Sequence, residues 1–457
     1  MSLSARDENA KVLGKLLGID DDDAAGLLEM TVIVRAASDA PSQAVRRHLV
    51  DLLKRAVGRV LETPDVTAGV EILIGDVVPT THGPVVRVAV TPAEITVSCE
   101  AAPEHDPGAT VPEILLLISA CYAAGMGVRL GLRRSFPLPH ADTIRVPVDR
   151  LLRGNALVGP VMLGRIYLAG AGAIGNGLLQ GLAVLDVEGE IHIVDPKNVT
   201  AGNLGRCVWF QERDIGRPKA EALAERAGPA LSRVKLVARV DRIQTLAERS
   251  AGPWLERLAV AVDSRRARRR LQEELPREVF DASTTGIEEI VVHFNGVGAD
   301  AACLSCIYDE DRVEAAHEQH VADMLGVDLA DVREHYIGRD AAQRMAARHG
   351  QLDPAQLVGT AYDSLFKSLC GTGQLGVDEG RTVLAPFSFV SVLAGAYLAL
   401  EIVLRISGDQ PVHPYNYWRA SPWTSPVLEL QVFRPRRLEC ETCGNSMIRS
   451  AVKQLWG

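Results

Sequence analysis

The sequence has little that is typical of a signal peptide in its first residues, no dense set of cysteines and no repeat of fixed period. Its first residues, MSLSARDENAKVLG, carry charges where a signal peptide has an apolar core. The eight cysteines are spread over 457 residues, which predicts thiols rather than disulfides and a cytoplasmic location. No low-complexity tract interrupts the chain, and at this length we expect two or three folded domains.

Excess positive charge is also missing. The chain has 49 lysines and arginines against 58 aspartates and glutamates, a net charge of -9, so we expect no nucleic-acid partner. One segment departs from this balance, a cluster formed by Arg265, Arg266, Arg268, Arg269 and Arg270. We interpret this cluster as one helix face near an anionic ligand and not as a nucleic-acid surface.

Long uncharged runs are equally scarce. Thr382 to Leu400 (TVLAPFSFVSVLAGAYLAL) has no charged residue and approaches the roughly 20 residues that a membrane helix needs. It contains Pro386 and several small or hydroxylated residues, and it is the only such run that we identify. We therefore predict a buried core helix and no membrane partner.

The first 150 residues predict a smaller α/β domain. Helical periodicity runs from Ser42 to Glu62, and VEILIG, VVRVAV and EITVSC have the pattern of short strands. The segment ILLLISACYAAG predicts a buried helix, and the acidic run Asp20 to Asp23 predicts a solvated helix start. The sequence shows no phosphate loop and no catalytic cluster here, so it does not indicate the role of this domain.

A strand, a glycine loop, a helix and a second strand follow from Arg165: RIYLAG, AGAIGN, GLLQGLAVL and EIHIVD. Gly170, Gly172 and Gly175 form G-x-G-x-x-G between the strand and the helix, where backbone N–H groups can bind phosphates. Asp195 ends the second strand, where its carboxylate can accept hydrogen bonds from a ribose. This pattern fits a nicotinamide-dependent oxidoreductase as well as a nucleotide-activating enzyme.

Two basic residues favour the nucleotide-activating enzyme. Arg206 and Lys219 follow Asp195 in the segments VDPKNVTAGNLGR and DIGRPKAEAL. An enzyme that cleaves between phosphates needs cations where charge develops, whereas a dehydrogenase only holds its pyrophosphate. The oxidoreductase hypothesis leaves both residues unexplained.

These segments, together with GAGAIGN and AVDSRRARRRLQ, resemble the adenylation domain of the ubiquitin-activating and ThiF/MoeB family. The resemblance spans roughly residues 163 to 310 and resumes near 380 to 457. It implies an enzyme that uses ATP and Mg²⁺ to activate the C-terminal carboxylate of a ubiquitin-like or sulfur-carrier protein as an acyl-adenylate. It also implies a homodimer, the usual state of the family.

The resemblance also implies roles for individual residues. It implies that Asp195 binds the ribose and that Asp263 assists magnesium or the reacting phosphate. The triphosphate contacts that it implies are those of Asn203, Arg206 and Lys219.

Three further positions bear on the match. Arg268 matches a basic position that often follows the aspartate at 263. Lys197 stands where the family usually has a second acid, and Cys207 stands where it usually has a glutamine. Either departure could alter nucleotide affinity or carrier preference.

Two C-x-x-C pairs predict a structural zinc site. Cys303 and Cys306 form one pair, and Cys440 and Cys443 form the other. Four thiolates can close a tetrahedral site and leave no open position for catalysis. A redox C-x-x-C is the alternative, but a redox site needs only one cysteine pair. The resemblance also favours zinc, since many adenylation domains of the family carry two such pairs.

Between the pairs lies a helical insertion, roughly Ile307 to Glu379. Its one cysteine, Cys370, follows a helical segment and precedes glycines, and Lys367 is near enough to favour the thiolate. Relatives that go beyond adenylation use a cysteine in such a region to form a thioester, so we predict Cys370 as the nucleophile. A buried thiol at 370 and the competitor Cys207 remain open, and His317 with His320 we interpret as a solvated face.

These observations predict an α/β protein with a Rossmann-like adenylation domain built on a mostly parallel sheet. We expect an N-terminal domain over residues 1–150, adenylation segments over 151–306 and 380–457, and the insertion over 307–379. The predicted activity is adenylation of a ubiquitin-like protein, a thioester on Cys370 and transfer to a conjugating enzyme, in a bacterial conjugation system. The alternatives are a sulfur-carrier adenylyltransferase without thioester transfer and a non-catalytic scaffold.

Overall fold

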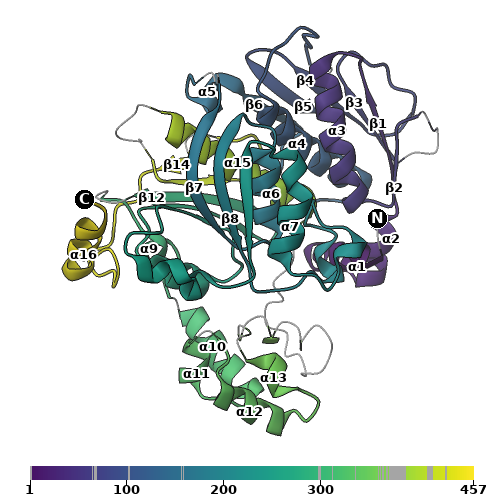
Figure 1. Cartoon of the computed structure of the whole chain (residues 1–457). Helices are drawn as coiled ribbons and strands as arrows, with labels where there is room; N and C mark the ends of the chain where they lie inside the picture. The colour runs from purple at the N-terminus through teal and green to yellow at the C-terminus, as the bar shows by residue number, and fades with distance from the viewer. Residues whose placement is uncertain are drawn as a thin grey trace.

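The computed structural model describes residues 3–63, 65, 69–100, 103–155, 157, 159–296, 300–310, 312–334, 336–358, 360, 362, 365–366, 369, 387–408, 415–427 and 430–457. Two sheets, each covered by helices, form the main body, and a small group of helices lies beneath it (Figure 1).

The N-terminal sheet has six strands in the order β2-β1-β3-β4-β5-β6. The first four of this order run parallel, and β5 and β6 are joined to them by antiparallel pairing. The strands are β1 (Thr31–Ala36), β2 (Arg59–Leu61), β3 (Val70–Ile74), β4 (Val85–Val90), β5 (Glu94–Ser98) and β6 (Thr143–Pro147). The helices of this part are α1 (Leu3–Leu17), α2 (Asp21–Leu28), α3 (Ala40–Ala56), α4 (Glu113–Gly131) and α5 (Val148–Leu152).

Local chemistry sets the ends of two of these helices. Asp20 caps α2 by accepting a hydrogen bond from the Asp23 N–H, so the acidic run begins a helix as predicted. The periodicity from Ser42 to Glu62 does not form one helix. α3 ends at Ala56 because Val57 adopts an extended conformation, and the chain continues into β2.

The larger sheet has eight strands in the order β14-β13-β12-β11-β10-β7-β8-β9. The five from β11 to β9 are parallel, and β12, β13 and β14 pair antiparallel. The strands are β7 (Val161–Ala169), β8 (Val187–Val194), β9 (Val234–Arg239), β10 (Arg257–Val260), β11 (Glu278–Thr285), β12 (Glu289–Gly296), β13 (Tyr417–Ala420) and β14 (Gln431–Val432). This mostly parallel arrangement is the predicted α/β fold.

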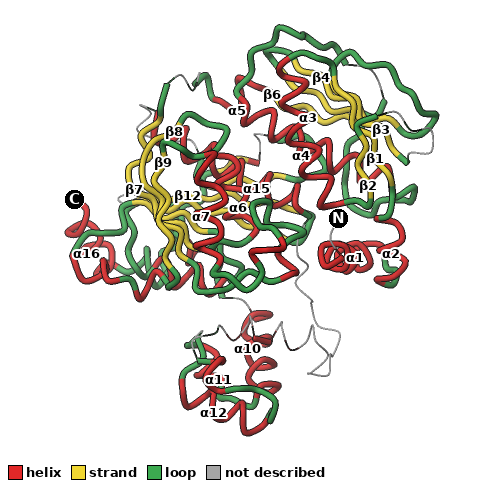
Figure 2. The backbone as a smooth tube through the Cα atoms, turned by 45° about the vertical axis from the view of Figure 1, so that its right-hand side comes forward, coloured by secondary structure: helices red, strands yellow, loops and turns green. Residues whose placement is uncertain are grey.

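The helices of the larger domain include α6 (Ala173–Leu182), α7 (Lys219–Ala227), α8 (Arg265–Gln272), α9 (Leu304–Ile307), α15 (Ser388–Ser407) and α16 (Ser446–Trp456). The helices beneath the body are α10 (Arg312–Leu325), α11 (Leu329–Arg333), α12 (Arg339–Arg348) and α13 (Pro354–Leu357). Figures 1 and 2 both show α10, α11 and α12 apart from the two sheets, and a hydrophobic cluster of their own holds them together.

One hydrophobic core joins the two sheets. Helix α15 lies against α6 so closely that a Cβ at Gly395 would meet the Gly177 carbonyl carbon at 2.1 Å. α15 also contacts α4, where the hydroxyls of Tyr122 and Tyr397 lie 2.7 Å apart. The two domains therefore share an interior and are not joined by a linker alone.

Two helices of this core have the length and composition of membrane spans. Ser388–Ser407 is one, overlapping the run predicted from sequence, and it is a core helix with 89% of its apolar window buried. Glu113–Gly131 is the second and is also 89% buried. The prediction of a single such run is therefore wrong. The sequence did not show α4 as a second run, because Glu113 and Arg129 limit its uncharged stretch near both ends.

Candidate functional site: the carboxyl edge of the parallel sheet

The glycine loop between β7 and α6 has a backbone that needs glycine at two positions. Gly170 has a φ of +102°, and a Cβ there would lie 2.7 Å from the Ala261 carbonyl oxygen. A Cβ at Gly175 would lie 2.2 Å from the Gly170 carbonyl oxygen. At Gly172, the residue before α6, a Cβ would meet nothing within 4 Å. The loop thus leaves the amino end of α6 open to a ligand.

Asp195, directly after β8, holds this loop. Its Oδ2 accepts a hydrogen bond from the Ala171 N–H at 2.8 Å, and its Oδ1 accepts one from the Lys197 N–H at 2.8 Å. The residue is 7% exposed. Both carboxylate oxygens already have a backbone donor, so a ribose hydroxyl would use a remaining lone pair.

Asp263 lies on the same edge, three residues after β10. Because β10, β7 and β8 are adjacent and parallel, their carboxyl ends bring Asp263, the glycine loop and Asp195 together. The Lys197 Nζ lies 3.8 Å from the Asp263 Oδ2. Lys197, which stands where the family usually has an acid, therefore pairs with Asp263, the residue that the resemblance links to magnesium.

Arg206 contacts the N-terminal helix α1. Its Nη1 lies 3.6 Å from the Glu8 Oε2 and, among the described residues, this buried nitrogen has no hydrogen-bond partner. Glu8 also packs on Gly202, in the short turn that contains Asn203. The Asn203 Oδ1 accepts a hydrogen bond from the Thr200 N–H at 2.9 Å. A carboxylate of the chain thus lies beside Arg206.

The loop that carries Arg206 is held from both domains. Arg55 of α3 donates hydrogen bonds to the carbonyls of Leu204 and Val208 at 2.5 and 2.6 Å. Asn176 of α6 accepts one from the Trp209 N–H at 3.1 Å and donates one to the Gly172 carbonyl at 2.9 Å. Asn176 therefore ties the arginine loop to the glycine loop.

Lys219 begins α7, and its N–H donates to the Lys197 carbonyl at 2.9 Å. Burial raises the pKa of the Cys207 thiol, and the positive charges of Arg206, Lys219 and Arg55 oppose the rise. The three cations therefore lie around Cys207, which is 0% exposed. A buried thiol with a raised pKa is a poor nucleophile, which argues against Cys207 as the acyl acceptor.

The four cysteines of the two C-x-x-C pairs come together. Their sulfurs lie within 4.8 Å of one another, with Cys303 to Cys440 at 3.7 Å and Cys306 to Cys443 at 3.3 Å. Zinc with sulfur ligands at ~2.3 Å gives sulfur–sulfur edges of about 3.8 Å. The donor set is therefore compatible with the predicted zinc site, which would join the end of β12 to the C-terminal segment.

The arginine cluster of α8 contacts protein groups. Arg266 and Arg268 are 6% and 3% exposed, and they pair with Glu318 and Asp281. Arg266 also donates to the Val332 carbonyl. The interpretation of this helix face as lying near an anionic ligand is wrong for these two arginines, because buried carboxylates and carbonyls already satisfy them.

The insertion is attached through the same helix. Glu318 of α10 is 2% exposed and accepts hydrogen bonds from Arg266 and from Arg333 of α11. His317 and His320 are exposed, in agreement with the predicted solvated face, and both also contact the Phe366 ring edge-on.

Over the described part of the chain, the four-cysteine cluster is the only grouping with metal-ligand geometry. Cys370 and Lys367 lie outside the described residues.

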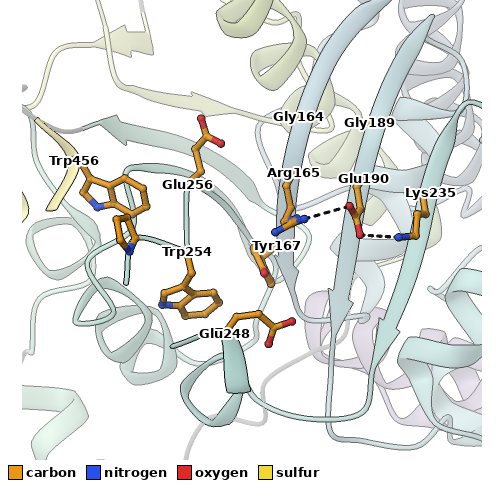
Figure 3. Close-up of a pocket in the computed structure, with 11 residues that line it drawn as sticks. Gly164, Arg165, Tyr167, Gly189, Glu190, Lys235, Glu248, Trp254, Glu256 and Trp456 are labelled. Atoms are coloured by element: carbon orange, nitrogen blue, oxygen red, sulfur yellow. Dashed lines mark hydrogen bonds and ion pairs between the residues drawn. The ribbon is translucent and has the colours of Figure 1, made fainter. Parts of the chain in front are cut away.

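A cavity of about 700 Å³ lies at the opposite edge of the sheet (Figure 3). Arg165, Glu190 and Lys235 line it from three neighbouring strands, and Glu190 lies 3.6 Å from Arg165 and 3.2 Å from Lys235. Trp254 and Trp456 form its aromatic side. Nucleotides bind outside the carboxyl ends of parallel strands, so this cavity at the amino ends is not the candidate nucleotide site.

Sequence reasoning missed three residues that organise the site: Glu8, Arg55 and Asn176. Asn176 stands within the motif GAGAIGN, so its place in the loop was visible even though its role was not. Nothing in the sequence around Glu8 or Arg55 marks a contact with a distant loop, which for Arg55 lies 149 residues away.

The geometry agrees with comparisons to known proteins. The sequence model of the ThiF family matches residues 162–442, more than half of the chain. The chain belongs to the ThiF family. A second model, the E1 N-terminal domain, matches residues 1–152.

Among similar proteins is the uncharacterized protein y4jF of Sinorhizobium fredii, which is 31% identical over 282 residues, 57% of this chain and 52% of that protein. The NEDD8-activating enzyme E1 catalytic subunit of Saccharomyces cerevisiae is 34% identical over 82 residues, 18% of this chain and 27% of that protein. The SAMP-activating enzyme E1 of Haloferax volcanii is 37% identical over 87 residues, 18% of this chain and 32% of that enzyme. The chain thus spans about half the length, or less, of these relatives.

Proposed function

We propose that this protein uses ATP to adenylate the C-terminal carboxylate of a ubiquitin-like or sulfur-carrier protein. The observation that carries the proposal is a set of charged groups at one edge of the parallel sheet. Asp263 follows the strand beside the open glycine loop, and Arg206 and Lys219 lie near Cys207. Membership in the ThiF family and similarity to relatives named activating enzymes support it.

In this reaction a carboxylate oxygen of the carrier attacks the α-phosphorus of ATP. A new oxygen–phosphorus bond forms, the bond to the β-phosphate oxygen breaks, and pyrophosphate leaves with the electron pair. Arg206 and Lys219 would stabilise the charge that develops on the phosphates. For Arg206 this requires exchange of its Glu8 contact for a phosphate contact.

Two metal ions complete the proposal. Mg²⁺ would bind at Asp263, whose carboxylate offers the oxygen ligand that this ion prefers, and would neutralise charge on the leaving pyrophosphate. Zinc would bind Cys303, Cys306, Cys440 and Cys443 as a closed structural site. The Lys197 ammonium, 3.8 Å from the Asp263 carboxylate, would compete with magnesium for the same negative charge.

After adenylation, we propose that Cys370 takes the acyl group as a thioester. Its thiolate attacks the acyl carbon, AMP leaves, and the thioester can then pass to the cysteine of a conjugating enzyme. The burial of Cys207 supports this choice among the two candidate thiols, since it removes the competitor. The four segment boundaries, the homodimer and a bacterial conjugation pathway stay predictions.

A cytoplasmic location is part of the proposal. Seven described cysteines are free thiols, and four of them form the candidate zinc site. Reduced cysteines and thiolate metal sites are typical of a reducing compartment.

Pyrophosphate exchange tests the adenylation step. Purified protein with ATP, Mg²⁺, labelled pyrophosphate and a carrier should return label to ATP, and alanine at Arg206 or Asp263 should abolish the signal. Alanine at Lys235, an exposed lysine on the opposite sheet edge, is the matched control and should leave exchange intact. Exchange that survives Arg206→Ala would contradict the proposed chemistry.

A non-reducing gel tests the thioester step. Incubation with ATP, Mg²⁺ and host lysate should give a thiol-sensitive adduct that Cys370→Ala removes and Cys99→Ala keeps. Cys370→Ala should leave pyrophosphate exchange unchanged. Adenylation without an adduct would favour the sulfur-carrier adenylyltransferase, and neither activity would favour the scaffold.

A further inference from the structure

A stacked pair of side chains lies beyond the carboxyl end of β9. The Arg242 guanidinium carbon lies 3.5 Å above the centroid of the Tyr336 ring. Arg242 follows β9 by three residues, and Tyr336 follows α11 of the helical insertion. The Arg242 Nε is buried and has no hydrogen-bond partner within the described part of the chain. The ion pairs and loops already described give this pair no role.

The order of the strands places the pair on the path of a bound nucleotide. The glycine loop follows β7, Asp195 follows β8, and Arg242 follows β9, and these three strands are neighbours in that order. The Asp195 N–H donates to the Arg239 carbonyl at 3.1 Å, so the ends of β8 and β9 are in direct contact. A nucleotide with phosphates on the loop and ribose at Asp195 therefore extends its base, one strand spacing of about 4.8 Å further, over the end of β9.

The electrostatics agree with this placement. Burial raises the pKa of Tyr336, the Arg242 guanidinium opposes the rise, and the carboxylates of Asp263 and Asp195 add to it. Both acids of the candidate nucleotide edge are thus close enough to act on the Tyr336 hydroxyl.

Helix α8 of the adenylation domain fixes the chain that leads to Tyr336. Arg266 of α8 donates to the carbonyl of Val332 in α11 and pairs with the buried Glu318 of α10. Arg270 of the same helix donates to the Arg333 carbonyl at 3.4 Å. The main chain three to four residues before Tyr336 is therefore fixed to the adenylation domain.

We propose that Arg242 and Tyr336 form the stacking platform for the nucleotide base, so that the helical insertion supplies one wall of the nucleotide site. An aromatic ring and a planar guanidinium both stack on nucleobases and tolerate different bases. The proposal rests on the proposed function, because it takes the glycine loop as the phosphate site. Nucleotide binding and the position of the insertion are then coupled through one side chain.

Isothermal titration calorimetry with two probes tests this platform. ATP with Mg²⁺ contains the base, whereas inorganic tripolyphosphate with Mg²⁺ contains only the phosphates. Tyr336→Ala and Arg242→Ala should each weaken ATP binding about tenfold, equivalent to about 1.4 kcal/mol, and leave tripolyphosphate binding unchanged. Tyr336→Phe keeps the ring and should retain the wild-type affinity for ATP.

Matched controls separate stacking from general damage. Arg344→Ala removes an exposed arginine of the insertion that pairs with Asp331 and should leave both affinities unchanged. Equal loss for both probes in Tyr336→Ala, or wild-type ATP affinity in that variant, would overturn the platform while leaving the proposed function intact. Wild-type protein that binds neither probe would overturn both.

Discussion

Lys197 allows a test of the proposed magnesium site at Asp263. Its Nζ lies 3.8 Å from the Asp263 Oδ2, and the two side chains are 41% and 63% exposed. Two unit charges at this separation in water attract by about 1 kcal/mol. Exposed pairs of this kind typically contribute ~0.2–1 kcal/mol, so about 1 kcal/mol is the upper limit.

In the proposed site, Mg²⁺ would compete with this lysine for the Asp263 carboxylate. Lys197→Ala should therefore lower the half-saturating Mg²⁺ concentration for ATP binding by up to about fivefold at low ionic strength. Lys197→Asp should lower it further, because a second carboxylate adds a ligand. The measurement is a Mg²⁺ titration of ATP binding by calorimetry at fixed ATP, repeated at high salt, where the effect of the alanine variant should shrink.

A charge-matched control isolates the local effect. Lys235→Ala removes the same charge from the opposite edge of the sheet, where the lysine is 72% exposed and pairs with Glu190. It should not change the Mg²⁺ dependence. The reasoning is refuted if Lys235→Ala and Lys197→Ala shift the titration equally, or if Lys197→Ala raises the Mg²⁺ concentration required.

Three further outcomes are expected. Glu8→Ala should tighten ATP binding up to about fivefold at low salt, because it frees Arg206, and calorimetry at high salt should show the gain vanish. Cys306→Ser should abolish binding at the proposed zinc site and lower the melting temperature, measured by metal analysis and calorimetry, whereas Cys99→Ser should leave both unchanged. Burial lowers the pKa of His293 to about 4 in the folded protein. As the pH falls below about 6.5, the unfolded chain therefore protonates His293 before the folded protein does. The unfolding free energy should therefore drop by about 3 kcal/mol between about pH 6.5 and 4 relative to His293→Gln, and parallel curves for the two proteins would contradict this.

Local constraints made part of the site readable from sequence. Gly170 has a positive φ, and Gly175 closely approaches the Gly170 carbonyl within the loop, so the motif and its strand–helix context suffice to predict the need for glycine at both positions. The two cysteine pairs could also be recognised from sequence, because the C-x-x-C spacing is typical of metal ligands.

The arginines of α8 show why other parts were not readable. Arg266 and Arg268 stand three and five residues after the predicted catalytic Asp263, and a basic residue there suits a phosphate as well as a carboxylate. The deciding partners, Glu318 and Asp281, lie 52 and 13 residues away in sequence. No local pattern distinguishes an arginine that awaits a ligand from one that already pairs with the chain.

The N-terminal domain gives the same lesson about function. It has no motif of its own, yet Arg55 binds two carbonyls of the loop that carries Arg206, at a separation of 149 and 153 residues. Asn9 of α1, the residue after Glu8, donates in turn to the Arg55 carbonyl at 2.8 Å. Because α1 and α3 reach the arginine loop together, a change in how this domain packs would move the proposed phosphate-binding arginine. The domain that the sequence could not interpret is therefore part of the candidate nucleotide site and not an appendage to it.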